Sequence, residues 1–230
     1  MPKGGFSSGP GRLALAGSLV LALAMAGGAH AATITDSRAD RPAASEAASP
    51  DARRLAAWVL ETADHHGRPF LIIDKQSARV LAYDSDGALL SSTAALLGAG
   101  RGDESPAGIG ARPLSGITPR ERITPAGRFV ASTGVNLSGK SILWVDYESA
   151  LSLHPVVTAR AADRRLERLA SATTLDNRIS YGCINVPADF YQTVVDPLFR
   201  TTTGIVYILP ETRSVESVFF RVKAANQTGS

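Results

Sequence analysis

Cysteine is almost absent from this chain: Cys183 is the single cysteine among 230 residues. One cysteine cannot form an internal disulfide, which leaves a link to a second chain, a buried apolar role or a reactive thiol. Free cysteine is among the most buried residue types, so a buried apolar role is the favoured interpretation until the surrounding sequence is considered.

Aromatic residues are also scarce, at 6%, while glycine and other small residues are frequent. This composition indicates a modestly packed fold with many turns. The hydrophobic share of 44% and the charged share of 20% are ordinary for a globular protein. The length fits one domain, or one domain with extra segments.

A long hydrophobic run is missing as well. Residues 13–28 are apolar, but the stretch is shorter than the roughly 20 residues of a spanning helix and is diluted by Gly and Ser. Lys3 and Arg12 precede it, and the small-x-small pattern of residues 29–31 follows. We therefore expect a cleaved export signal over residues 1–31, with an uncleaved membrane anchor as the alternative. The expected location is the periplasm or the exterior, with no membrane span after cleavage.

Most of the net charge of +3 belongs to the predicted signal. Lys3 and Arg12 leave with the signal and no acidic residue does, so the remaining chain is nearly neutral. The charge therefore gives no case for a nucleic-acid partner.

The segment after the signal predicts a linker and then one helix. Residues 33–50 are rich in Ala, Ser, Asp and Pro without apolar periodicity, which is typical of a flexible linker. Ser49 is a suitable N-cap, Pro50 suits the first helical position, and Gly67 is the expected end. One face carries Leu55, Trp58, Val59 and Thr62. We expect a packing or spacer helix.

From residue 69 onward the pattern changes to short β-prone runs with few helices. Strands are expected over residues 70–74, 79–84, 88–97, 124–132, 142–147, 150–154, 178–186 and 205–209. A helix is expected over residues 187–199, opened by Pro187. The fold class predicted from these runs is mainly β, with a few short helices.

Three further segments have open roles. The Gly- and Pro-rich residues 98–118 predict a long loop, either a lid or binding loop or a disordered segment. The Arg-rich residues 158–170 have helical spacing and indicate a solvated surface helix rather than a binding site. Residues 214–223 place apolar side chains on one helical face, which could dock on the domain or on a partner.

The sequence around Cys183 is the most informative stretch. In an extended segment Tyr181, Cys183 and Asn185 point to the same side. Gly182 leaves room for a substrate carbonyl, and backbone amides here could donate to an oxyanion. A thiol with a reference pKa of about 8.5 becomes a better nucleophile beside a cationic imidazole.

Only three histidines follow the signal. His65 and His66 stand at the polar end of the first helix, where surface or capping roles are expected. His154 closes an apolar strand and is the best candidate base, with an exposed strand-end histidine as the alternative.

Together these residues carry a family resemblance. The run at 124–129 (Thr-Pro-Ala-Gly-Arg-Phe), then His154, then the run at 180–185 (Ser-Tyr-Gly-Cys-Ile-Asn) resemble the L,D-transpeptidase (YkuD-type) catalytic domain. The likeness covers about residues 68–210, with residues 32–67 as linker and helix and residues 211–230 as a tail. The pieces are specific because they occur in the right order.

The resemblance implies a β-sandwich or barrel without a metal or organic cofactor. It implies that Cys183 is the nucleophile and His154 the base, in an enzyme that acts on peptidoglycan stem tetrapeptides. D-alanine would leave, and an amine of a second stem or of a lipoprotein would resolve the thioester, or water in a carboxypeptidase. Amides near Gly182 would hold the oxyanion, and Asn185 would orient the site that Ser180 and Tyr181 complete.

Three departures from the family pattern keep alternatives open. Tyr181 replaces a histidine, Pro155 replaces a glycine, and the interval from His154 to Cys183 is long. Proline keeps its carbonyl, so a backbone acceptor for the imidazole N–H is retained. Alternatives are a wall-binding protein that has lost catalysis, a papain-like protease, which the His-before-Cys order disfavours, and a structural buried cysteine.

Overall fold

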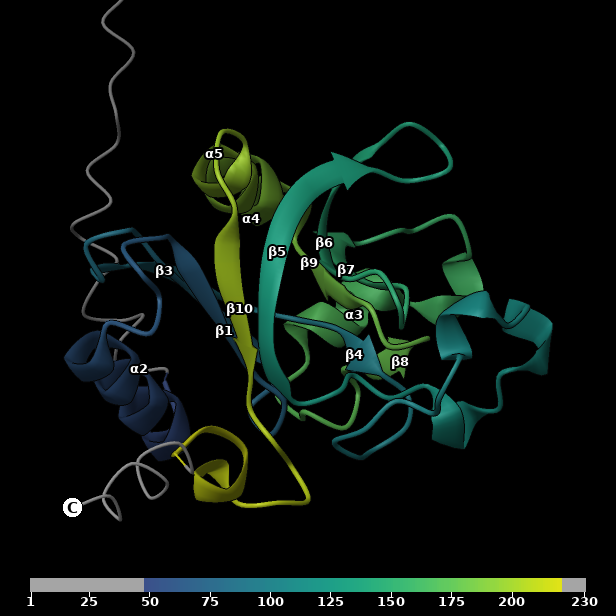
Figure 1. The fold of residues 1–230 in the computed structure, drawn as a ribbon. Coiled ribbons are helices and arrows are strands. Elements are labelled where there is room, and N and C mark those ends of the chain that lie inside the picture. The colour runs from purple at the N-terminus through teal and green to yellow at the C-terminus, as the bar shows by residue number, and fades with distance from the viewer. Residues whose placement is uncertain (1–47, 221–230) are drawn as a thin grey trace, which may run out of the picture. The chain divides into compact units, whose positions relative to one another are not determined.

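The computed structural model of the protein describes residues 48–220 (Figure 1). The predicted export signal and most of the predicted linker, residues 1–47, lie outside the described residues, as do residues 221–230. Within the described range, no helix has both the length and the apolar character needed to cross a membrane.

The described chain is built on one eight-stranded sheet, which confirms the prediction of a mainly β fold with a few short helices. All neighbouring strands are antiparallel except the β1–β10 and β7–β9 pairs. The strand order is β3 (Leu89–Ala94), β2 (Arg79–Tyr83), β1 (Phe70–Asp74), β10 (Gly204–Ile208), β5 (Gly127–Val135), β6 (Ser141–Asp146), β7 (Leu151–Pro155) and β9 (Ile184–Val186).

Strand β5 joins the two halves of this sheet. Its residues 127–131 pair with β10, and its residues 132–135 pair with β6. Figure 1 shows the strong bend of β5 between the two halves. The bend lets both halves contribute to one apolar core, in which Leu71, Leu143, Leu153, Ile184 and Val206 are all fully buried.

Two predicted strands are each split in the structure. The run at 88–97 becomes β3 and then β4 (Leu97–Gly98), because the chain leaves β2 after Ala95 and the amide of Leu96 donates to Asn185 O instead. The run at 178–186 becomes β8 (Arg178–Ser180) and β9, since Gly182 has φ +128 between them. β4 and β8 pair in parallel as a separate two-stranded sheet.

Helix α2 (Pro50–Thr62) has the predicted cap, since the side chain of Ser49 accepts a hydrogen bond from Ala52 N. It ends at Thr62 rather than Gly67, because Ala63 adopts the left-handed conformation. The resulting turn carries His65 onto the core, where it is 8% exposed and contacts the Phe70 ring. The prediction of a surface or capping role for His65 is therefore wrong.

A second apolar cluster lies on the outer face of β1 and β10. Leu55 and Val59 of α2 pack there with Phe70 and Tyr207, and so does Phe219 of the tail turn η6 (Glu216–Phe220). Figure 1 shows α2 and the yellow tail turn on the same side of the sheet. The described part of the tail thus docks on the domain.

The opposite face is covered by one continuous helical segment. It comprises α4 (Ala188–Phe190), the π-helical turn η5 (Tyr191–Val195) and α5 (Asp196–Phe199), as predicted from Pro187. Tyr191, Val195 and Phe199 bury their side chains in the main core.

The predicted loop at 98–118 is ordered by short 3₁₀ turns and a buried anchor. The turns are η1 (Ile109–Ala111), η2 (Leu114–Gly116) and η3 (Pro119–Glu121). At the start of the loop, Lys75 donates to Gly102 O at 2.5 Å and to Asp103 at 2.8 Å, and its side chain is fully buried.

Candidate active site

Strands β7 and β9 bring the predicted nucleophile and base to one place. They are parallel neighbours in which His154 pairs with Asn185, and Cys183 lies just before β9. Ser152 is two residues before His154, so both side chains point to the same face of β7. On that face Ser152 Oγ lies 3.4 Å from Cys183 Sγ.

The thiol of Cys183 has surroundings that favour its ionised form. Sγ also lies 3.6 Å from the carbonyl oxygen of Ala150, to which the thiol donates. Burial alone would raise the pKa of Cys183. The neighbouring His154, through its charge, and the contact with Ser152 outweigh burial, so the pKa is lowered.

The imidazole of His154 is held at both nitrogens. Nδ1 donates to Pro155 O at 2.8 Å, so the carbonyl of proline does serve as the backbone acceptor. Nε2 lies 3.1 Å from Asn185 Nδ2 and accepts from it. Burial would lower the pKa of His154, but the interaction with Cys183 and the Pro155 hydrogen bond outweigh it, so the pKa is raised.

The side chain of Asn185 connects His154 to the Arg-rich segment. Its Oδ1 accepts from Arg165 Nη1 at 2.8 Å, and Arg165 Nε donates to Asp163 at 3.1 Å. Arg165 belongs to α3 (Arg165–Ala170), which the sequence predicted only as a solvated surface helix. That prediction is incomplete: three of the six residues of α3 are exposed, but the side chain of Arg165 is 17% exposed and contacts Asn185.

The backbone before Cys183 is held by the Thr-Pro-Ala-Gly-Arg-Phe run. Thr124 is fully buried, and its Oγ1 donates to Gly182 O at 2.7 Å and accepts from Gly98 N at 2.9 Å. At Gly182 a Cβ would come within 2.8 Å of Ile123 O, on a backbone of φ +128. Position 182 therefore requires glycine.

Ser180 closes the turn that presents the thiol. Its Oγ accepts from Gly182 N at 3.1 Å and donates to Cys183 O at 2.6 Å. The amide of Gly182 is thus engaged with Ser180. Within residues 48–220 the amide of Cys183 has no protein acceptor, so it is the better placed donor for an oxyanion.

Tyr181 stands beside the thiol and under a cation. Its ring is 39% exposed and lies 3.8 Å from the guanidinium carbon of Arg122. Tyr181 and Cys183 line the same small cavity of about 10 Å³. Ile109 of η1 and Glu121 of η3 line it as well. This volume is about that of one water molecule.

Two larger spaces flank this cavity. One of about 380 Å³ shares Ile109 with it and carries acidic side chains, among them Glu104 and Glu148. The other, of about 360 Å³, lies against His154 and is lined mainly by Ile142, Val156 and Thr158 with Lys140 at its side. The first space and the cavity at the thiol are bordered in common by Ile109, Ser105 and Ser149, of which Ile109 has the largest side chain.

The sequence reasoning missed three residues of this site. Ser152 gave no signal beyond its position two residues before His154. Thr124 belonged to a quoted motif, but its contact with Gly182 depends on a pairing 58 residues apart. Nothing in the sequence distinguished Arg165 from the other arginines of residues 158–170. Within the described residues, no group of three or more His, Cys, Asp or Glu side chains is placed to hold a metal ion.

The comparisons with known proteins find likeness in structure only. No protein-family model matches the sequence, and no curated protein matches it. One similar structure is the L,D-transpeptidase (residues 123–326) from Xylanimonas cellulosilytica DSM 15894, at 16% identity and TM-score 0.36, covering 61% of this chain and 60% of that chain.

A second similar structure is LD transpeptidase LdtMt1 in complex with imipenem, at 16% identity and TM-score 0.37, covering 61% of this chain and 58% of that chain. A third is the catalytic domain from the E. faecium L,D-transpeptidase, at 18% identity and TM-score 0.31, covering 62% of this chain and 98% of that chain. This chain thus spans less than two thirds of the first two structures.

Proposed function

We propose that this chain is a cysteine acyltransferase of the L,D-transpeptidase type that acts on peptidoglycan stem peptides outside the cytoplasm. The observation that carries the proposal is the Cys183–His154 pair. The pKa of the thiol is lowered and that of the imidazole is raised, so each stabilises the charged form of the other. Such a pair is an activated nucleophile with its base.

The first half of the reaction forms a thioester. His154 Nε2, once released from Asn185 Nδ2, takes the proton of Cys183 on its lone pair, and the sulfur attacks the carbonyl of the L-centred residue of a stem tetrapeptide. The amide C–N bond to the terminal D-alanine breaks, and the imidazolium returns its proton to the leaving amine. The amide of Cys183 would donate to the oxyanion.

The second half transfers the acyl group. An amine attacks the thioester carbonyl, the C–S bond breaks, and the amine proton passes through His154 to regenerate the thiol. Three acceptors fit this chemistry: the amine of a second stem, the amine of a lipoprotein, or water in place of an amine. The sequence resemblance supports the substrate class, and the residues that carry the resemblance lie around the thiol.

A covalent probe tests the nucleophile. We expect imipenem, the ligand named in the LdtMt1 structure, to add to this protein at Cys183. Intact mass and peptide mapping would locate the adduct. The same adduct on Cys183→Ala, or no adduct on the wild type, would contradict the proposal.

Digestion of isolated sacculi tests the reaction. The protein should release D-alanine and change the muropeptide profile, and the products should identify the acceptor by mass. Cys183→Ala is the control and should leave the profile unchanged.

The small size of the cavity at Cys183 favours one alternative, a peptidoglycan-binding protein that has lost catalysis. The space of about 10 Å³ beside the half-buried thiol is narrow, and Ile109 and Glu121 border it. Co-sedimentation with sacculi, together with an unchanged muropeptide profile, would support this alternative over the enzyme.

A further inference from the structure

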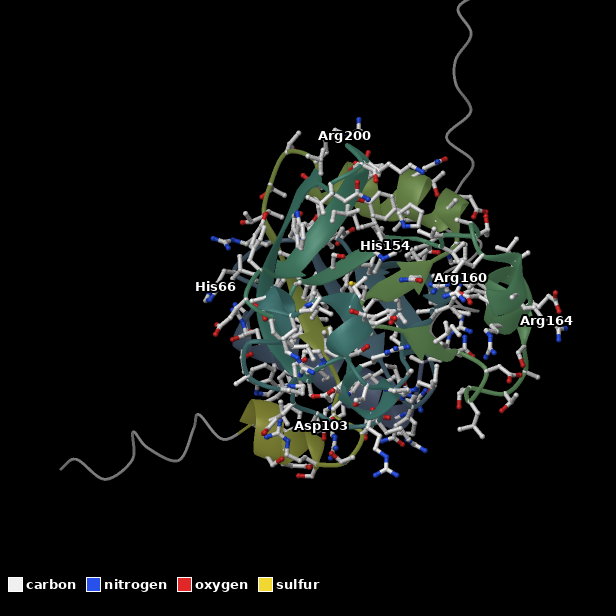
Figure 2. All side chains as sticks on the ribbon, turned by 90° about the vertical axis from the view of Figure 1, so that its right-hand side faces the viewer. His66, Asp103, His154, Arg160, Arg164 and Arg200 are labelled. Carbon is white, nitrogen blue, oxygen red and sulfur yellow. The ribbon has the colours of Figure 1, made fainter. Side chains whose placement is uncertain are left out.

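The Arg-rich segment contains one side chain that reaches the proposed active site. Residues 163–170 carry several charges, and Arg164 is 71% exposed in its side chain, whereas Arg165 is 17% exposed. In Figure 2, Arg164 lies at the outer edge of this segment and points away from His154. The turn from Arg164 into α3 therefore directs neighbouring arginines to opposite sides.

The contacts of Arg165 determine the orientation of the Asn185 amide. A guanidinium has donors only, so the atom of Asn185 that it contacts at 2.8 Å must be the oxygen. The NH₂ group of the amide is then turned to His154, where Nδ2 lies 3.1 Å from Nε2. Asn185 is 1% exposed, so water has little access to satisfy a flipped amide.

This orientation has a consequence for the imidazole. Nδ1 already donates to Pro155 O, and an NH₂ group cannot accept, so Nε2 must carry a lone pair. The ring is thus held neutral, and its Nε2 lone pair becomes available to a thiol proton when the Asn185 N–H moves away. A flipped Asn185 would instead present its oxygen to Nε2 and favour the protonated ring.

We propose that Arg165 is a positioning residue: it holds the Asn185 amide so that an N–H is directed at His154 Nε2, which fixes the neutral form of His154 with its proton on Nδ1. The role rests on the proposed function of His154 as the base. The segment that lengthens the interval from His154 to Cys183 is thus part of the site, although it need not touch substrate.

Charge acts in the same direction. Arg165 lowers the pKa of His154 by its positive charge, against the larger upward influence of Cys183. The other charged groups near the ring are Asp163, which pairs with Arg165, and Lys140, which lines the cavity beside His154. Removal of Arg165 should therefore raise the pKa of His154 through both the amide and the charge.

The test is an NMR titration of the His154 ring in the whole protein, with the signal identified by its loss in His154→Ala. Arg165→Met should raise the pKa of His154 by about one unit, the lower end of the effect of a charge within about 4–6 Å. Arg164→Met, the adjacent exposed arginine, should leave it unchanged. Arg165→Gln keeps a donor and loses the charge, so its shift should be smaller.

A double-mutant cycle separates positioning from general damage. The Arg165→Met effect on the His154 pKa should shrink markedly in the Asn185→Ala background, leaving only the charge contribution. An unchanged or lowered pKa in Arg165→Met, or equal shifts in both backgrounds, would overturn the proposal. If Arg165→Met does not fold, Arg165→Gln and Arg165→Lys decide by the same readout.

These titrations need no peptidoglycan, so they separate the two proposals. If Arg165→Met raises the pKa of His154 as described but the wild type does not act on sacculi, the positioning role stands and the proposed enzymatic function is contradicted. Turnover of sacculi with no His154 shift would retain the enzyme and remove the positioning role.

Discussion

His154 Nε2 and Asn185 Nδ2 lie 3.1 Å apart across the parallel β7–β9 pair, in which these two residues are register partners. Side chains of register partners stand on the same face of a sheet, so the contact follows directly from strand pairing. The thiol of Cys183 lies at the start of the same strand pair, against Ser152. The site is therefore placed by the sheet itself rather than by loops alone.

Loss of the base should make the thiol less reactive. In His154→Ala burial still raises the pKa of the thiol, and the contributions of His154 that lower it are lost while those of Ser152 remain. The rate of iodoacetamide alkylation should then rise only at higher pH. The midpoint of its pH profile should lie above that of the wild type. Turnover should fall about 10²–10⁴-fold.

His66→Ala is the matched control, because His66 is exposed and Figure 2 shows it far from His154. An alkylation midpoint in His154→Ala equal to that of the wild type would remove His154 from the role of base.

Thr124→Val should loosen the turn that carries the thiol. The isosteric change leaves Gly98 N and Gly182 O without their buried partner, which costs about 1–3 kcal/mol. Because Gly182 precedes the nucleophile, turnover should fall more than stability explains. Denaturant unfolding and turnover with sacculi measure the two effects.

Thr133→Val is the comparison variant. Its hydroxyl donates to a backbone carbonyl, that of Phe199 at 3.3 Å, and Thr133 lies in β5 rather than in the segment that holds Gly182. It should lose some stability and keep its turnover. Equal turnover in both variants would speak against the role of Thr124.

Ile109→Ala should open the thiol to larger reagents. Ile109 is 7% exposed and borders both the cavity of about 10 Å³ and the space of about 380 Å³. Its truncation should speed reaction with a bulky maleimide more than reaction with iodoacetamide. The pH midpoint should stay where it is, because no charged group is removed.

Leu114→Ala serves as the control, since Leu114 belongs to the same segment and is 60% exposed. A maleimide rate in Ile109→Ala no faster than in Leu114→Ala would show that Ile109 does not limit access.

Lys75→Met should strongly destabilise the fold. Lys75 and Asp103 form an ion pair with side chains 0% and 2% exposed, and Glu211 lies 3.7 Å away. Removal of Lys75 leaves the buried carboxylate of Asp103 without its cation, at a cost of about 3–5 kcal/mol. Arg200→Met breaks a surface pair with Asp196 and should cost no more than about 1 kcal/mol.

The Lys75 effect should depend on pH. Burial would raise the pKa of Asp103, but hydrogen bonds from Lys75, Thr212 and backbone amides outweigh it and hold the pKa well below its usual range. A depressed carboxyl pKa contributes stability above its unfolded value of about 3.9, which is lost as pH falls further. The difference in free energy of unfolding between wild type and Lys75→Met should therefore persist from pH 7 to about pH 5 and narrow only as pH falls below about 4. A constant difference would contradict this assignment.

Local signals in the sequence predicted the strands and the helix caps. The Ser49 cap, the runs at 70–74 and 205–209 and the Pro187 helix depend on near neighbours, and the structure has all of them. The end of α2 was wrong because the left-handed turn uses Ala63 and not the glycine that usually fills such a position.

The predicted site residues come together, but the sequence did not predict the contacts around them. Cys183, His154 and Asn185 meet because β7 and β9 pair in parallel, a long-range relation. The Gly182 amide was expected to be available and instead donates to Ser180 Oγ. Arg165 could not be told from its neighbours, because its contact with Asn185 depends on how α3 docks.

The most direct test of the central claim is to trap the acyl group on the sulfur. The protein would be mixed with a stem tetrapeptide donor without an amine acceptor, quenched in acid and weighed intact. The account predicts a mass increase equal to the donor minus D-alanine, located on Cys183 and absent from Cys183→Ala. D-alanine release without any thioester on Cys183, or neither product, would contradict it.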